Sequence, residues 1–88
     1  MSWKVKISSV AEKYYKTLDR KLRRRIKEST LSLSQYENPL EHSQVKALTA
    51  DLKGFYRLRV GKYRIIFALL EKERIIAVVN IFPRGKAY

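Results

Sequence analysis

The sequence contains no cysteine and only one histidine, His42. It can therefore form neither a disulfide nor a thiolate metal site, and no zinc site with two histidines. It also has no Gly-rich phosphate loop and no Ser/His/Asp grouping. No apolar run is long enough for a signal peptide or a membrane-spanning helix. We therefore expect a soluble, cytoplasmic protein, and the sequence shows no motif for a metal or a cofactor.

Acidic residues are scarce as well. Eight Asp and Glu face twenty Lys and Arg, which gives a net charge of +12 on 88 residues. Because so basic a domain repels itself, we expect an acidic binding partner, either a nucleic acid or an acidic protein. A membrane surface is less favoured, since the aromatic residues lie in strand-like segments rather than on one helical face.

The chain is long enough for one domain with a modest core, and we expect residues 1–88 to form a single unit without repeats or linkers. Trp3, Val5 and Ile7 alternate with lysines, which predicts a first strand with one buried face. Ser9 and Glu12 fit a capping box and predict the start of a first helix.

A second helix is predicted to begin after Asp19 as N-cap. Its core stripe is formed by Leu22, Ile26 and Leu33, and it should stop near the Asn38-Pro39 pair. Arg20 to Lys27 make this helix strongly basic. Such a run is most often a solvated face and next most often a contact with nucleic acid or the ribosome.

After a loop over residues 38–54 the hydrophobic period changes from helical to alternating, and three strands are predicted over residues 55–60, 63–70 and 75–82. Gly61 and Lys62 fit a two-residue type II′ turn between the first two of these strands. The last two strands are apolar at nearly every position, which indicates central strands covered on both faces. The fold class is therefore α+β, with an N-terminal strand, a two-helix hairpin and a three-stranded antiparallel meander.

The predicted hairpin register places Val60 opposite Tyr63 and Arg59 opposite Arg64. Because side chains alternate along a strand, Arg57, Arg59 and Arg64 should emerge on one face. Like charges on facing strands destabilise a hairpin unless an anion lies among them, and arginine suits bidentate phosphate contacts. The cluster thus favours a phosphate site, although solvated surface arginines remain an alternative.

The segment 83–88 places Arg84 and a terminal Tyr88 just past the last strand. A base can stack on a tyrosine ring for roughly 1–3 kcal/mol. A frayed chain end without function is the alternative.

Three segments carry a resemblance to a known family. The hairpin run 56–64, the C-terminal run 83–88 and the upstream Lys46-Ala47-Leu48 resemble RelE-type toxins of the RelE/ParE superfamily, in the pattern of their archaeal branch. The resemblance extends over the whole chain, including its length, charge and element order. It implies a small curved sheet with the helices on one side. An arginine followed by a terminal tyrosine points to the nuclease branch.

This resemblance implies a ribosome-dependent endoribonuclease. Such toxins cut messenger RNA in the ribosomal A site without a metal, by attack of the 2′-hydroxyl on the adjacent phosphate. By the resemblance, the catalytic residues are Arg57, Arg64, Arg84 and Tyr88. The residues that bind RNA are Arg59, Lys62, Lys86 and Lys46. The general base stays unassigned, since arginine remains protonated in proteins.

The resemblance also implies a partner, an acidic RelB-like antitoxin that covers the basic face and blocks the region of Arg84 and Tyr88. Leu31, which lies off the core stripe of its helix, is a possible contact for it. Three alternatives to the nuclease remain open: a gyrase inhibitor of the ParE branch, a non-catalytic RNA-binding module, and a degenerate toxin that binds only its antitoxin.

Overall fold

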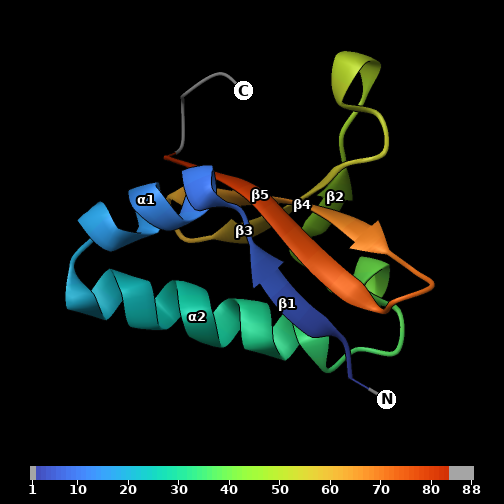
Figure 1. Cartoon of the computed structure of the whole chain (residues 1–88), viewed down its shortest axis with the longest axis horizontal. Coiled ribbons are helices and arrows are strands. Elements are labelled where there is room, and N and C mark those ends of the chain that lie inside the picture. Colours follow the sequence, from blue (N-terminus) through green and yellow to red (C-terminus); the bar gives the residue numbers. More distant parts are fainter. Residues whose placement is uncertain (1, 84–88) are drawn as a thin grey trace.

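A computed structural model describes residues 2–83, and Figure 1 shows the arrangement of its elements. The elements follow one another as β1 (Lys4–Ile7), α1 (Ser9–Thr17), α2 (Arg20–Ser34), β2 (Val45–Ala47), β3 (Tyr56–Val60), β4 (Tyr63–Leu70) and β5 (Ile75–Pro83). Two short 3₁₀ helices, η1 (Pro39–Glu41) and η2 (Ala50–Leu52), lie on either side of β2.

The five strands form one sheet in the order β1-β5-β4-β3-β2. The strand β1 runs parallel to β5, and the other neighbours are antiparallel. Both helices pack on one face of this curved sheet (Figure 1). The predicted α+β fold with two helices and a meander is confirmed, and the structure adds β2 inside the segment predicted as a loop.

Both helix starts are capped by a side chain. As predicted, Asp19 caps α2, because its carboxylate accepts a hydrogen bond from the backbone N–H of Leu22 at 2.8 Å. The prediction for α1 was wrong by one residue, since Ser8 and not Ser9 is the N-cap. The Ser8 hydroxyl accepts from the backbone N–H of Ala11 at 3.1 Å and donates to the carbonyl of Val79 at 2.8 Å. Ser8 is the cap because it leaves β1 in an extended conformation and points back at β5.

The helix α2 ends at Ser34, earlier than the Asn38-Pro39 pair suggested. The buried Ser34 presents its carbonyl to the N–H of Trp3 at 2.7 Å, so the incoming first strand satisfies the end of the helix. After Ser34 the backbone hydrogen bonds span three residues instead of four, as in the bond from the N–H of Tyr36 to the carbonyl of Leu33. The helix therefore ends where its carbonyl meets Trp3, just before β1, and not at the proline.

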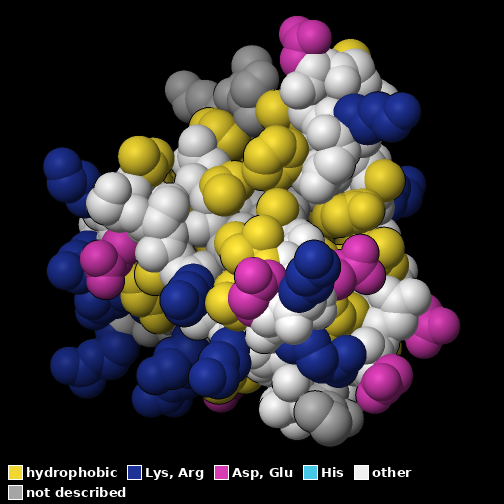
Figure 2. Space-filling model, turned by 45° about the vertical axis from the view of Figure 1, so that its right-hand side comes forward, with side chains coloured by type: hydrophobic (Ala, Val, Ile, Leu, Met, Phe, Trp, Pro, Cys, Tyr) yellow, Lys and Arg dark blue, Asp and Glu magenta, His cyan; other side chains and the backbone are white. Residues whose placement is uncertain are grey.

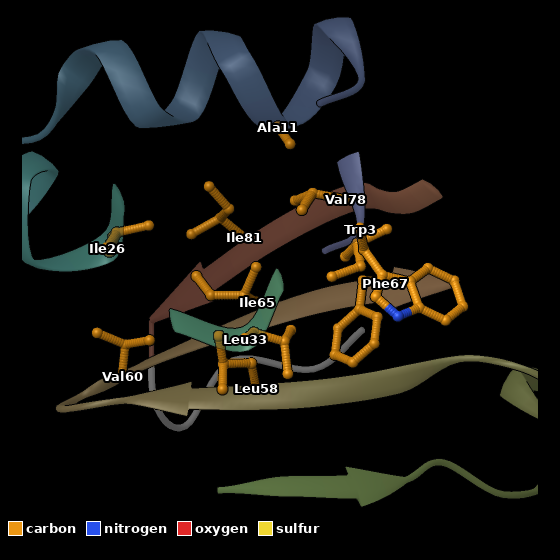
Figure 3. Packing of buried hydrophobic residues seen from close by; sticks show 11 residues of the cluster. Trp3, Ala11, Ile26, Leu33, Leu58, Val60, Ile65, Phe67, Val78 and Ile81 are labelled. Atoms are coloured by element: carbon orange, nitrogen blue, oxygen red, sulfur yellow. The ribbon is translucent and has the colours of Figure 1, made fainter. Parts of the chain in front are cut away.

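The core lies between the helices and the sheet (Figure 3). Ile26 and Leu33 of the predicted α2 stripe are buried there, and Leu22 packs at the margin. The sheet contributes the residues that alternate toward the helices, among them Leu58 and Phe67, which are fully buried. No helix among residues 2–83 is long and apolar enough to cross a membrane.

The opposite face of the sheet is only partly covered. Ile66 and Ile75 are buried on it, whereas Leu70 is 44% exposed. The prediction that both late strands are covered on both faces therefore holds only for part of their length. This open face carries the arginines of the β3–β4 hairpin.

Candidate functional site

The β3–β4 hairpin has the predicted register. Val60 pairs with Tyr63, and Arg59 pairs with Arg64. Gly61 has a φ of +58°, which a type II′ turn requires at its first central position. Because Leu58 and Val60 are buried in the core, the alternating arginines emerge on the open face of the sheet.

The strand β2 brings a fourth cation to this face. Lys46 pairs directly with Arg57, while its neighbour Val45 pairs with the buried Leu58. We call Lys46, Arg57, Arg59 and Arg64 the basic face. Arg57 and Arg64 are half-buried, and Lys46 and Arg59 are exposed.

The backbone holds the edge of the basic face in place. The carbonyl of Gln44, just before β2, accepts a hydrogen bond from the backbone N–H of Arg59 at 3.0 Å. It also accepts from Nη1 of Arg57 at 3.2 Å. One nitrogen of the Arg57 guanidinium is thus held by the backbone, and a guanidinium carries further N–H donors beyond this one.

A shallow hollow opens at the tip of the hairpin. It is lined by Arg57, Arg59, Gly61, Lys62, Tyr63 and Arg64, and its volume is about 130 Å³. Since a water molecule occupies about 30 Å³ in the liquid, the hollow can hold a phosphate group with some of its hydration. None of the described residues that line it is acidic. A cluster of cations of this kind is suited to bind a polyanion.

Arg25 of α2 joins this cluster, and the sequence analysis did not assign it. A Cβ built on Gly61 would lie 2.9 Å from the Arg25 Nη1, so the guanidinium packs directly against the turn. The sequence did show a basic helix and a glycine at the turn. The helical period alone, however, does not tell which arginine of that helix reaches the turn. In Figure 2, Lys and Arg side chains crowd the lower left, at the height of α2 in Figure 1.

The described residues around the hollow offer no obvious proton acceptor. His42, the only histidine, accepts a hydrogen bond at Nδ1 from the N–H of Gln44 at 3.0 Å and contacts the Tyr36 ring. It therefore orders its own loop. Burial raises the pKa of Tyr14, and the neighbouring Tyr63 raises it further, so Tyr14 stays protonated at neutral pH. Among residues 2–83 no group of His, Asp and Glu is arranged to hold a metal ion.

Three of the predicted site residues, Arg84, Lys86 and Tyr88, lie outside the described residues. The last described residue, Pro83, pairs with Tyr63 beside the hairpin turn. The structure thus brings together Lys46, Arg57, Arg59, Lys62 and Arg64, and β5, as far as it is described, ends at Pro83 next to the hairpin turn.

Comparison with known proteins identifies relatives. Residues 3–88 match the model of the ParE toxin of a type II toxin–antitoxin system, parDE. The archaeal RelE in the RelE–RelB complex from Pyrococcus horikoshii is 32% identical over 99% of this chain and 100% of that chain, with a TM-score of 0.76. No match was found among curated proteins.

Two more distant structures share the fold. A chain of a RelBE toxin–antitoxin complex from Mycobacterium tuberculosis has a TM-score of 0.84 at 20% identity, over 98% of this chain and 95% of that chain. A chain of the intact Escherichia coli RelBE complex has a TM-score of 0.71 at 15% identity, over 98% of this chain and 100% of that chain.

Proposed function

The chain belongs to the ParE toxin family of type II toxin–antitoxin systems, within the RelE/ParE superfamily, and from this premise we propose that it cleaves messenger RNA in the ribosomal A site. The observation that carries the proposal is the basic face together with its hollow at the hairpin tip. A metal-independent phosphoryl-transfer site uses such a cluster of cations to stabilise the negative charge that develops on the phosphate.

The proposed reaction uses the RNA's own 2′-hydroxyl as nucleophile. Its oxygen bonds to the adjacent phosphorus, and the bond from phosphorus to the 5′-oxygen of the next nucleotide breaks. The hydroxyl proton passes to solvent or ribosomal RNA, and the leaving 5′-oxygen takes up a proton. The products are a cyclic phosphate and a free 5′-hydroxyl.

In this proposal Arg57 and Arg64 hold the scissile phosphate and stabilise the charge that develops on it. Their guanidiniums remain charged, so they contribute electrostatic stabilisation and orientation for in-line attack rather than proton abstraction. Arg84 stabilises or protonates the leaving oxygen, and Tyr88 stacks on the cleaved nucleotide. Arg59, Lys62, Lys46 and Lys86 bind flanking phosphates.

We also propose an acidic antitoxin of the RelB type as the partner of this chain. The Pyrococcus and Escherichia relatives were solved as toxin–antitoxin complexes. The net charge of +12 calls for an acidic partner, and Leu31 is 49% exposed on α2, away from the core stripe. An apolar contact at Leu31 together with charge complementarity would hold such a chain on the toxin.

A second candidate function is gyrase inhibition, which the match to the ParE model favours. It uses the same fold without nuclease chemistry. A non-catalytic RNA-binding module and a degenerate toxin that binds only its antitoxin would also keep the basic face. These alternatives predict no cleavage of message.

Primer extension on a message in a cell-free translation reaction tests the proposal. We expect cuts within codons at the A site, and we expect Arg64→Ala to reduce the cleavage rate by about 10²–10³, the usual cost of losing one such contact. Lys72→Ala is the matched control, because Lys72 is an exposed cation in the distant β4–β5 turn.

Undiminished cuts in Arg64→Ala would remove Arg64 from the site. An absence of cuts by the unaltered toxin, combined with loss of supercoiling in a gyrase assay, would establish the second candidate instead.

A further inference from the structure

A second hollow lies on the open face of the sheet, and its lining is apolar where that of the first is basic. We call it the apolar hollow. It is lined by Leu52, Phe55, Ile66, Val79, Asn80 and Phe82. The segment with η2 supplies one wall and the strands β4 and β5 supply the floor. Figure 2 shows hydrophobic side chains gathered below the loop that carries η2.

A bulge in the sheet shapes this hollow. Ile66 pairs with Asn80, but the next residue of β4, Phe67, pairs with Val78, so Val79 is the extra residue. A bulge bends its strand and turns a side chain away from the regular alternation. Here it adds Val79 to the lining on the open face. Bulges occur often beside functional sites.

The apolar hollow adjoins the basic face. Phe82 pairs directly with Arg64, and Ile66 pairs directly with Arg57. Side chains on directly paired residues have Cβ atoms about 4.5–5.5 Å apart. The two half-buried arginines of the basic face therefore each have an apolar neighbour of the hollow on the adjoining strand.

We propose that the apolar hollow is a nucleobase subsite that receives an unpaired base of the RNA whose phosphate lies on the basic face. This inference rests on the proposed function, because it assumes that the ligand is RNA. Phosphates and bases alternate along a single strand, so a site for one must meet the other. Proteins that bind single strands pair a basic groove with aromatic surfaces on which bases stack.

The chemistry of the lining favours a base over the apolar side chain of a protein partner. Phe82 supplies an aromatic surface, and Asn80 supplies a polar group at the floor. The Asn80 side-chain oxygen accepts from the backbone N–H of Ile81 at 3.0 Å, which leaves its amide N–H groups as the donors for a ligand. Every nucleobase carries ring or carbonyl acceptors, whereas an aliphatic side chain carries none.

Binding of a short oligouridine with 2′-O-methyl riboses tests the inference, since this RNA cannot be cut. Fluorescence anisotropy compares it with an abasic oligomer of the same length and charge. We expect the unaltered protein to bind the base-containing RNA about 5- to 150-fold more tightly. Phe82→Ala should abolish most of this preference and Phe82→Tyr should retain it.

Leu70→Ala is the matched control, because Leu70 is an exposed apolar residue of β4 outside the hollow. It should keep the preference, and thermal unfolding establishes that each variant is folded. Because Tyr88 is also proposed to stack on a nucleotide, the preference counts for the apolar hollow only as far as Phe82→Ala removes it. An equal affinity for both RNAs, or a preference that survives Phe82→Ala, would overturn the subsite.

The outcomes also separate this inference from the proposed function. A protein whose preference for the base-containing RNA depends on Phe82, but which never cuts message, keeps the subsite and loses the nuclease. A protein that cuts message but has no preference loses only the subsite. If Phe82→Ala leaves the preference intact and instead prevents antitoxin binding, the hollow belongs to the protein partner and the inference is wrong.

Discussion

At the scale of single residues, the hairpin turn links the basic helix to the basic face. Gly61 adopts a φ of +58°, a region that costs a residue with a side chain roughly 1–2 kcal/mol. Its missing Cβ also leaves the space in which the Arg25 guanidinium lies. One glycine thus allows the turn and places a cation beside it.

We predict that Gly61→Ala lowers the free energy of unfolding by about 1–2 kcal/mol and weakens RNA binding severalfold, because it displaces Arg25. Gly54→Ala is the matched control. Gly54 has a φ of +98°, but a Cβ there meets nothing within 4 Å. This variant should lose stability without losing RNA affinity. Equal RNA affinities of the two variants, measured by anisotropy, would contradict a role for Arg25.

The residues of the basic face differ in how far the sequence could predict them. Arg57, Arg59 and Arg64 follow from the alternation of a strand and the length of a turn, which are local properties. The position of Lys46 in the site rested on the resemblance alone, and its pairing with Arg57 became visible only in the sheet. Arg25 depends on how a helix packs across a turn, which periodicity does not specify.

At the scale of elements, Ser8 connects β1, α1 and β5. Its hydroxyl caps the helix and donates to β5, and its own N–H donates to the carbonyl of Val78 at 2.8 Å. A single side chain therefore fixes the angle at which the first helix leaves the sheet. The loss of that hydroxyl affects two elements at once.

We predict that Ser8→Ala lowers the free energy of unfolding by about 1–2 kcal/mol, the usual cost of losing a helix N-cap. Ser9→Ala, at the exposed neighbouring position, should change it by less than about 0.5 kcal/mol. Denaturant titrations of the two variants give the comparison. A larger loss in Ser9→Ala would mean that the capping box predicted from the sequence forms in solution.

Most elements could be predicted, and those that could not share a cause. The strand β2 has only three residues, and its partner β3 lies beyond η2 in the sequence. A strand of that length carries too few alternating positions for a pattern, so its identity depends on pairing with β3. The same applies to the end of α2, which the N–H of Trp3 determines.

At the scale of the whole molecule, the charge predicts how binding responds to salt. A single-stranded nucleic acid releases about 0.7 counterions for each phosphate that is neutralised. In the proposed function Arg57 and Arg64 share the scissile phosphate, and Arg59, Lys62, Lys46 and Lys86 each bind one flanking phosphate. With these five phosphates, the logarithm of the affinity should fall with the logarithm of the salt concentration with a slope of about −3.5.

We predict that Lys46→Ala reduces this slope by about 0.7, because it removes one phosphate contact. Lys72→Ala, which removes an equal charge in the β4–β5 turn, should leave the slope unchanged. Anisotropy titrations at several salt concentrations measure both. Identical slopes for the two variants would mean that RNA responds to the net charge and not to the basic face.

The parallel pairing of β1 with β5 has a consequence for synthesis of the chain. The hydrogen bond from Ser8 to Val79 spans 71 positions, and the sheet has no partner for its first strand until the last one exists. Contacts so distant along the chain form late in folding, since closing long loops costs entropy first. We therefore expect the nascent chain to stay unfolded until its final strand has left the exit tunnel. The sheet that carries the basic face would then be completed only when β5 is available to pair with both β1 and β4.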